Sequence, residues 1–305
     1  MNIHIFGAAA GIGKWLVKNV FTGGVNVFAY DIDKKIDVVL LDYGNVVPCF
    51  LDIGNSVEGD FLKKYAGEFN DGDIFVLAIP KSELSDTIKC LKLHFPTGAL
   101  CAVATSTQYE ALSLLKEVLG EKCVLGFHPL FGPTVKNTYG QLVALCDYRK
   151  DCYLHDSLRG LLVKSGLQIS VLSAKEHDKY MSYVQVLTHF ILLSFMDLIS
   201  KEEFSLDDLI KVKTPPFQLL SAFASRMLLG SPLTYASIQD TDQAKMVRDK
   251  LIGRMIKLNE CFDSSDVNRM SNRIENIKAP FSGPLLEELS QFSILSVNAV
   301  QELEK

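Results

Sequence analysis

Residues 3–13, IHIFGAAAGIG, place a short apolar run directly before a glycine-rich turn. The run has the length and the β-branched content of a buried strand, and a helical pattern begins immediately after the turn. Gly7, Gly11 and Gly13 stand where the chain must turn sharply and where a helix N-terminus can lie close to an anion. This strand–turn–helix unit is typical of the first part of a nucleotide-binding α/β sheet.

Apolar runs and helical patterns alternate through the first half of the chain. We expect strands in IHIFG at 3–7, VNVFAY at 25–30, DIFVLAIP at 73–80, ALCAVAT at 99–105, CVLGFH at 123–128, QLVALCD at 141–147 and QISVLS at 168–173. We expect helices in LVKNVF at 16–21, SELSDTIKCLK at 82–92, YEALSLLKEVL at 109–119 and HDSLRGLLVKSG at 155–166. Several strands lack polar alternation, as strands covered on both faces do. The pattern predicts a doubly wound, mostly parallel α/β sheet of Rossmann type.

Strand patterns stop after Lys175, and long helical patterns follow, separated by proline-containing breaks such as KTPPF at 213–217. We therefore predict a Rossmann-like domain over residues 1–174 and an all-α domain over residues 175–305. The apolar stretch at 180–199 contains polar side chains whose insertion into a bilayer would be costly. We interpret it as a buried helix of a protein core.

Composition argues against several classes of protein. A formal net charge of −5 provides no general attraction for nucleic acid or for an anionic membrane surface. The 7 cysteines are an odd number without a CxxC pair, so neither a zinc site nor a disulfide framework is expected. No basic segment precedes the first apolar run, so no signal peptide is expected. These features predict a cytoplasmic protein with reduced thiols and no metal.

An acidic residue ends the second predicted strand. Asp31 follows Gly13 by 18 residues, the spacing at which a carboxylate accepts hydrogen bonds from an adenosine ribose. The same negative charge would repel a 2′-phosphate, so Asp31 favours NAD over NADP. The structural alternatives are an aspartate that caps a turn and a glycine turn that binds no ligand.

GFHPLFGP at 126–133 is the most specific stretch of the chain. His128 follows a predicted strand, at the carboxyl end where open α/β sheets carry their chemistry. Pro129 keeps the backbone of His128 out of the helical region, and the second proline stiffens the exit. The ordinary pKa of histidine lies near neutrality and suits a general base. A solvent-exposed loop histidine is the alternative.

SAKEHDKYM at 173–181 opens the helical half, with acidic residues that complement the dipole of the helix start. We interpret His177 as a solvated or capping residue. Gln185 and His189 follow, one helical turn apart, and are predicted to face inward on a largely apolar helix. Buried polar groups need partners, so both are candidates for substrate binding. A core histidine with its hydrogen bonds satisfied is the alternative.

Gln218 and Arg226 lie on the helical pattern that follows Pro215-Pro216. Their separation corresponds to about 80° around a helix, so both side chains can face one cleft. Arginine can bind a carboxylate through two parallel N–H bonds. A surface salt bridge is the alternative for Arg226.

HPLFGP at 128–133, SAKEHDKYM at 173–181 and VQVLTHF at 184–190 resemble the prephenate/arogenate dehydrogenase family. The resemblance implies NAD-dependent oxidative decarboxylation of prephenate to 4-hydroxyphenylpyruvate, a step of tyrosine biosynthesis. It implies that His128 is the catalytic histidine at the C4 hydroxyl and that Ser106 lies beside this hydroxyl and the nicotinamide. His189 and Arg226 are implied to contact the substrate. A homodimer built by the helical domain is also implied, without a fused chorismate mutase domain.

The chain departs from the family at three positions. Val103 and Gln108 stand where relatives have roughly aspartate and lysine, and Gln218 stands where some have arginine. The same chemistry on arogenate or 4-amino-4-deoxyprephenate therefore stays open, as does a non-catalytic NAD-binding regulatory protein. A β-hydroxyacid dehydrogenase is disfavoured, because Lys175 and Lys179 lack the glycine-rich setting of the catalytic lysine in those enzymes.

Overall fold

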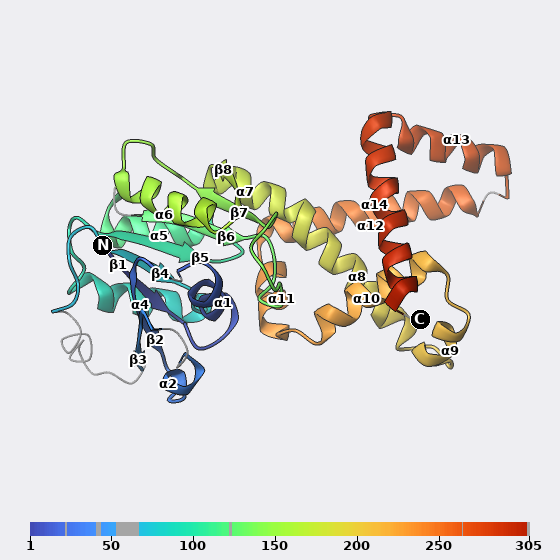
Figure 1. The fold of residues 1–305 in the computed structure, drawn as a ribbon. Coiled ribbons are helices and arrows are strands. Elements are labelled where there is room, and N and C mark those ends of the chain that lie inside the picture. Colours follow the sequence, from blue (N-terminus) through green and yellow to red (C-terminus); the bar gives the residue numbers. More distant parts are fainter. Residues whose placement is uncertain (22, 41–43, 53–66, 122–123, 264, 304–305) are drawn as a thin grey trace. The chain divides into compact units, whose positions relative to one another are not determined.

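A computed structural model describes the chain except for residues 22, 41–43, 53–66, 122–123, 264 and 304–305 (Figure 1). The chain divides into two compact units, Met1–Met181 and Ser182–Lys305. The first unit contains a sheet, and the described residues of the second form helices without strands. The division falls after the predicted boundary at 174/175, because helix α7 (Ala174–Met181) packs its buried side chains into the first unit.

One sheet of eight strands forms the centre of the first unit, in the order β3-β2-β1-β4-β5-β6-β7-β8. Its strands are β1 (Asn2–Phe6), β2 (Asn26–Asp31), β3 (Val46–Phe50), β4 (Ile74–Leu77), β5 (Leu100–Ala104), β6 (Val124–Pro129), β7 (Leu142–Cys146) and β8 (Gln168–Leu172). Neighbouring strands are parallel except β6 and β7, which are antiparallel. The predicted doubly wound, mostly parallel sheet is confirmed.

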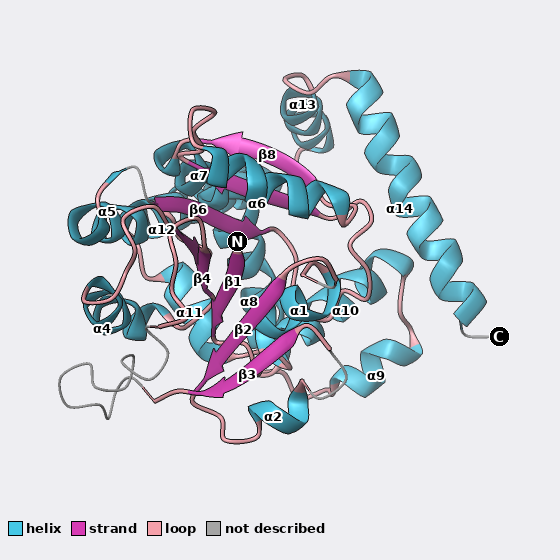
Figure 2. Ribbon diagram, turned by 60° about the vertical axis from the view of Figure 1, so that its left-hand side comes forward, coloured by secondary structure: helices cyan, strands magenta, loops and turns pink. Residues whose placement is uncertain are grey.

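Helices cover both faces of this sheet (Figures 1 and 2). Helices α1 (Gly11–Asn19) and α6 (Tyr153–Lys164) bury their apolar residues in one core. Helices α4 (Lys81–Lys92) and α5 (Tyr109–Leu119) bury theirs in the other. The short helix α2 (Ile36–Val39) joins the first core. Because successive strand residues point to opposite faces, strands β1 to β7 supply both cores, whereas β8 contributes only Ile169, to the first core.

The second unit is built from helices and two small cores. Its elements are the π-helical turn η3 (Ser182–Leu187), α8 (Thr188–Ile199), α9 (Leu206–Lys211), α10 (Pro215–Leu228), α11 (Pro232–Gln239), α12 (Asp242–Phe262), α13 (Val267–Lys278) and α14 (Gly283–Leu303). Leu192 of α8 packs on Ala224 and Met227 of α10. Val186 of η3 packs against Ile238 and Ala244.

The helical stretch Ala174–Ile199 has the length and hydropathy of a membrane span, with a mean hydropathy of 1.5. One helix of this kind is weak evidence for a membrane protein, because core helices of water-soluble proteins pass the same test. Only 17% of its most apolar window is buried, and Leu192 is the single buried residue of α8. The prediction that residues 180–199 form a buried core helix is therefore wrong for a single copy of the chain.

Candidate active site

Strand register aligns the predicted residues of the first unit along one edge of the sheet. Neighbouring strands pair in register through Phe6, Leu77, Val103 and Gly126. Just beyond these positions lie Gly7 after β1, Ser106 after β5 and His128 at the end of β6. Strands β1 and β4 are neighbours although β2 and β3 lie between them in sequence, so the winding reverses there. Open α/β sheets bind ligands at such a switch point.

The glycine loop is shaped by close backbone contacts. A Cβ atom on Gly7, whose φ is +84°, would collide with the carbonyl oxygen of Ala78. A Cβ on Gly13 would collide with the carbonyl oxygen of Gly7, and Gly11 has a φ of +54°. Ala10 provides no side-chain cap for α1, and no acidic residue lies in its first turn. The helix N-terminus therefore presents backbone N–H groups suited to a pyrophosphate.

A cavity of about 340 Å³ lies beside the glycine loop at the end of β2. It is lined by Phe6, Gly7, Tyr30, Asp31, Ile32, Leu51, Asp52, Ile79, Pro80, Glu83 and Thr87. The Asp31 carboxylate accepts hydrogen bonds from the backbone N–H groups of Ala9 at 2.8 Å and Asp33 at 3.0 Å. Asp31 thus does cap a turn, and each oxygen keeps a second lone pair for a ribose hydroxyl. Apolar walls beside carboxylates suit an adenosine.

His128 is buried, with 4% of its surface exposed. Its Nδ1 lies 2.8 Å from Nε2 of His177. Burial lowers the pKa of His128 to about 3; the neighbouring His177 acts in the same direction, and Asp178 opposes both. The ordinary pKa near neutrality therefore does not apply, and the imidazole is neutral over the physiological range. A neutral imidazole is the form that can act as a base.

His177 is fully buried, so its interpretation as a solvated or capping residue is wrong. Its Nδ1 lies 2.7 Å from Oδ1 of Asp178. The capping group is Asp178, which accepts hydrogen bonds from the backbone N–H groups of Gln108 and Tyr109 at the start of α5. Burial opposes the ionisation of Asp178, but the bonds from His177 and from these two N–H groups hold its pKa below the usual value.

Gln108 ties the loop that carries Ser106 to the strand that carries His128. Ser106 is half-buried between β5 and α5. The buried Gln108 side chain donates through Nε2 to the carbonyl oxygens of Thr105 at 2.7 Å and Phe127 at 3.4 Å. The glutamine that departs from the family pattern thus has a structural role at the site.

Gln185 and His189 lie in the second unit, in η3 and α8, and both are half-buried. The Nδ1 atom of His189 is buried and has no hydrogen-bond partner among the described residues. Burial lowers the pKa of His189, and its ring packs edge-on against Tyr235 at 5.1 Å. A buried ring nitrogen without a hydrogen-bond partner fits a histidine that contacts a ligand better than a core histidine whose hydrogen bonds are satisfied.

Gln218 and Arg226 lie on α10 of the same unit. Gln218 is half-buried and Arg226 is exposed. Within the described part of the chain, no carboxylate forms a salt bridge with Arg226. The predicted substrate-binding residues thus share the second unit, and the predicted catalytic and cofactor-binding residues share the first.

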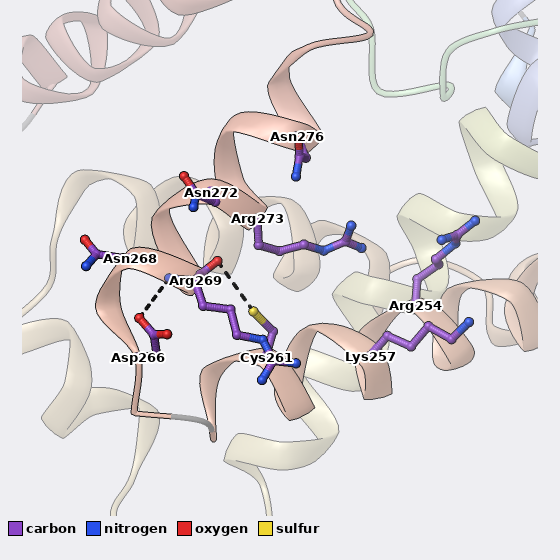
Figure 3. A pocket seen from close by; sticks show the side chains of 9 residues that line it. All are labelled: Arg254, Lys257, Cys261, Asp266, Asn268, Arg269, Asn272, Arg273 and Asn276. Carbon is purple, nitrogen blue, oxygen red and sulfur yellow. Dashed lines mark hydrogen bonds between the residues drawn. The ribbon is translucent and has the colours of Figure 1, made fainter.

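A second cavity, of about 610 Å³, lies between α12 and α13 of the second unit (Figure 3). It is lined by Arg254, Lys257, Cys261, Asp266, Asn268, Arg269, Asn272, Arg273 and Asn276. Asp266 uses its carboxylate to cap α13, through the backbone N–H of Arg269 at 3.0 Å. None of the predicted site residues lines this cavity, so we do not assign the chemistry to it.

Sequence comparisons identify curated relatives of the chain. The family described as "Prephenate dehydrogenase, dimerization domain" matches residues 173–276. A "Probable arogenate/prephenate dehydrogenase" of Methanocaldococcus jannaschii is 24% identical over 270 residues, which cover 87% of this chain and 58% of that protein. The "T-protein" of Haemophilus influenzae is 30% identical over 168 residues, 55% of this chain and 44% of that protein. The chain therefore spans less than two thirds of these relatives.

Solved structures with the same fold include two dehydrogenases. Prephenate dehydrogenase from Aquifex aeolicus, in complex with hydroxyphenyl propionate and NAD+, has a TM-score of 0.70 at 18% identity, over 92% of this chain and 96% of that one. Synechocystis arogenate dehydrogenase has a TM-score of 0.67 at 14% identity, over 92% and 98%. At these identities the likeness shows the fold.

The domain match and the Methanocaldococcus relative name the same kind of dehydrogenase. The domain match begins at Ser173, the first residue of the SAKEHDKYM segment, and the Methanocaldococcus relative aligns over most of the chain. The chain is therefore similar to prephenate/arogenate dehydrogenases, by the domain match over residues 173–276 and by the Methanocaldococcus relative.

Proposed function

We propose that the protein oxidises prephenate with NAD and releases CO₂, forming 4-hydroxyphenylpyruvate for tyrosine biosynthesis. The observation that carries the proposal is a buried, neutral histidine at the sheet edge that also bears the glycine loop. The names of the sequence relatives and the ligands of the Aquifex aeolicus enzyme support the same chemistry.

NAD fits the groups at this edge. The N-terminus of α1 would hold the pyrophosphate, since side chains at Gly7 and Gly13 would collide with the backbone. Asp31 would accept hydrogen bonds from the adenosine ribose in the adjoining cavity. When bound, NAD supplies the acceptor for a hydride from C4 of the substrate.

The residues of the chain then accept one proton and orient the substrate. His128 takes the proton of the C4 hydroxyl as the hydride leaves C4, so the C4 oxygen becomes a carbonyl. Loss of the C1 carboxylate as CO₂ sends its bonding electrons into the ring, and the C4 oxygen recovers a proton as a phenol. Ser106 would lie beside the same hydroxyl.

Four residues of the second unit are proposed to bind the substrate. Arg226 would grip a carboxylate, and the buried Nδ1 of His189 would accept or donate a hydrogen bond. Gln218 and Gln185 would add neutral hydrogen bonds. None of these groups takes part in proton transfer, so their loss should raise KM more than it lowers kcat.

Substrate choice is the finer part of the proposal, and arogenate and 4-amino-4-deoxyprephenate are the alternatives. The test is NADH formation by the purified protein with each of the three compounds, with product analysis. Prephenate should give the highest kcat/KM, and release of CO₂ should match NADH one to one. No NADH with any of them would favour a non-catalytic NAD-binding protein instead.

Gln218→Arg tests the substrate choice directly. Prephenate is a dianion, whereas the side chain of arogenate bears an ammonium group, so an added arginine should favour prephenate. A hydrogen bond to a charged group contributes about 1.5–3 kcal/mol, roughly ten- to a hundredfold in affinity. The prephenate-to-arogenate ratio of kcat/KM should rise, and Arg226→Gln should damage both reactions. An unchanged ratio would mean that Gln218 does not line the site.

We also propose that the protein is a cytoplasmic homodimer. The matched family domain is described as a dimerization domain, and α13 has no buried residue in one chain. The cytoplasmic part of the proposal rests on the sequence, whose 7 cysteines are an odd number without a CxxC pair.

A further inference from the structure

A chain of two hydrogen bonds ends on His128. Oδ1 of Asp178 lies 2.7 Å from Nδ1 of His177, and Nε2 of His177 lies 2.8 Å from Nδ1 of His128. His177 has no exposed surface, and His128 has 4%. Neither bond is therefore in competition with bulk water.

The chemistry of Asp178, His177 and His128 decides which atom donates and which accepts in each of the two hydrogen bonds. The ionised carboxylate of Asp178 accepts only, so Nδ1 of His177 must donate to it. A neutral imidazole has one donor and one acceptor nitrogen, so Nε2 of His177 accepts the N–H of His128 Nδ1. The acceptor lone pair of His128 then lies on Nε2. A general base needs this lone pair for the substrate hydroxyl.

We propose that His177 and Asp178 are positioning residues that hold His128 in the tautomer protonated at Nδ1, with Nε2 as the base. The inference rests on the proposed function for the role of His128, but the tautomer itself is a property of the protein alone. It gives a chemical reason for the adjacent histidine and aspartate in the EHD segment at 176–178.

Asp178 also links the Asp178–His177–His128 hydrogen-bond chain, called the relay below, to the loop that carries Ser106. Its carboxylate accepts the backbone N–H groups of Gln108 at 2.8 Å and Tyr109 at 2.9 Å, at the start of α5. Ser106 lies just before that helix. One carboxylate therefore holds both the histidine that orients the base and the helix start beside the second catalytic residue.

Helix α7 is anchored independently of the relay. Ser173 and Glu176 exchange the hydrogen bonds of a capping box, and Asp147 accepts the backbone N–H of Ala174 at 2.9 Å. The backbone that carries His177 should therefore keep its place when the side chain is changed. Variants at this position then report on the relay more than on folding.

The direct test is nuclear magnetic resonance of the histidine rings in the full-length wild-type protein without substrate. The chain has only six histidines, so long-range ¹H–¹⁵N correlations of a ¹⁵N-labelled sample can be assigned by single substitutions. His128 and His177 should both carry the proton on Nδ1 near neutral pH. Protonation of His128 on Nε2, or a doubly protonated His177, would overturn the proposal.

Two variants of His177 separate orientation from packing. His177→Gln keeps an acceptor for His128 and a donor for Asp178, whereas His177→Leu keeps neither. In the Leu variant, kcat should fall on the order of 10²-fold, the cost of misplacing a catalytic group, while the Kd for NAD changes little. The Gln variant should recover most of this loss and keep the Nδ1–H signal of His128.

His155→Leu is the matched control, because His155 is also fully buried in the first unit and its Nδ1 accepts the backbone N–H of Arg149. It should lower the unfolding midpoint without changing kcat or the tautomer of His128. Equal kcat values for the Leu and Gln variants of His177 would refute the relay. If no compound of the panel is oxidised, the proposed function fails, but the ring spectra still decide the tautomer.

Discussion

At the scale of single residues, the protonation of His128 is set by its burial. The pKa of this histidine is lowered to about 3, so the ring is deprotonated at every pH above that value. A base is active when deprotonated, so this group should produce no fall in kcat between about pH 8 and about pH 5. A tenfold fall per pH unit beginning near pH 6.5, present in the wild type and absent in a His128 variant, would contradict this.

His128→Asn tests the role of the base itself. The amide keeps the size of the side chain but cannot take the hydroxyl proton at a useful rate. We expect kcat to fall by roughly 10²–10⁴, the usual contribution of a positioned general base, with binding of NAD unchanged. Stopped-flow single turnovers and isothermal titration would measure the two effects. Full turnover by this variant would remove His128 from the mechanism.

Asp31 should decide between NAD and NADP through its charge. Asp31→Asn keeps an acceptor oxygen for only one of the N–H groups of Ala9 and Asp33, which the aspartate binds through different oxygens, and it removes the repulsion of a 2′-phosphate. The ratio of kcat/KM for NAD over NADP should therefore fall, roughly ten- to a hundredfold for a loss of about 1.4–3 kcal/mol. Asp31→Ala should also weaken the binding of NAD, because the turn loses its cap. A preference of the wild type for NADP would contradict the interpretation.

The partners of these residues lie beyond what local sequence can predict. The position of His128 at a strand end follows from HPLFGP, since a strand pattern and two prolines surround it. Its contact with His177 joins residues 49 positions apart, and no local periodicity indicates such a pair. The lowered pKa depends on the same long-range packing, so the sequence supports only the ordinary value.

At the scale of elements, strand β1 places a histidine inside the core. His4 is fully buried, and its ring stacks on Phe28 and Phe75 at 5.0 and 4.5 Å. Its nitrogens lie 3.1 Å from Tyr30 Oη and 3.2 Å from Asp73 Oδ2. Burial lowers the pKa of His4 to about 4, although the hydrogen bond and charge of Asp73 act in the opposite direction.

His4 should therefore make the fold sensitive to acid. The unfolded chain binds a proton at His4 below about pH 6.5, whereas the folded chain does so only below about pH 4. The unfolded state is favoured as pH falls through this window, by about 2 kcal/mol at pH 5 from this residue. Urea unfolding followed by the fluorescence of Trp15, the single tryptophan, reports on the same unit.

His4→Phe is the informative variant, because it keeps the stacking and cannot titrate. Its free energy of unfolding should vary less with pH than that of the wild type, by about 2 kcal/mol between pH 7.5 and pH 5. His155 and His128 also have lowered pKa values and act equally in both proteins. Identical pH dependence of the two proteins would show that His4 titrates normally.

Element prediction succeeded where the hydrophobic period was clear. Helices α1, α4, α5 and α6 and all strands except β3 lie within or near the predicted ranges. Strand β3, VVPCF, was missed because Pro48 lacks an N–H and argues against a central strand. The structure places β3 at the sheet edge, where proline is tolerated. The contacts of helix α7 with β6 and α5 are not visible in its own sequence, so the predicted boundary at 174/175 separates α7 from elements that it contacts.

At the scale of the whole molecule, one chain leaves a large apolar surface exposed. Side chains of α13, α14 and the turn between them that are between 44% and 75% exposed are Val267, Ile274, Ile277, Phe281, Leu285, Leu289, Phe292, Ile294 and Leu295. Leu285, Leu289, Phe292 and Leu295 recur at intervals of three or four and form one helix face. Patches of this kind are rare on monomers and mark association surfaces.

The homodimer proposed above would cover this surface, and the matched dimerization domain includes most of α13. Phe292→Glu would place a carboxylate in the middle of the apolar face of α14 and should convert a dimer into a monomer in sedimentation velocity experiments. Gln291→Glu is the matched control: it adds the same charge to the neighbouring exposed residue and should leave the dimer intact. Binding of NAD should persist in both variants, because the glycine loop and Asp31 belong to the first unit. A monomeric wild type, or a Phe292→Glu variant that stays dimeric at micromolar concentration, would assign the exposed face of α14 to another contact.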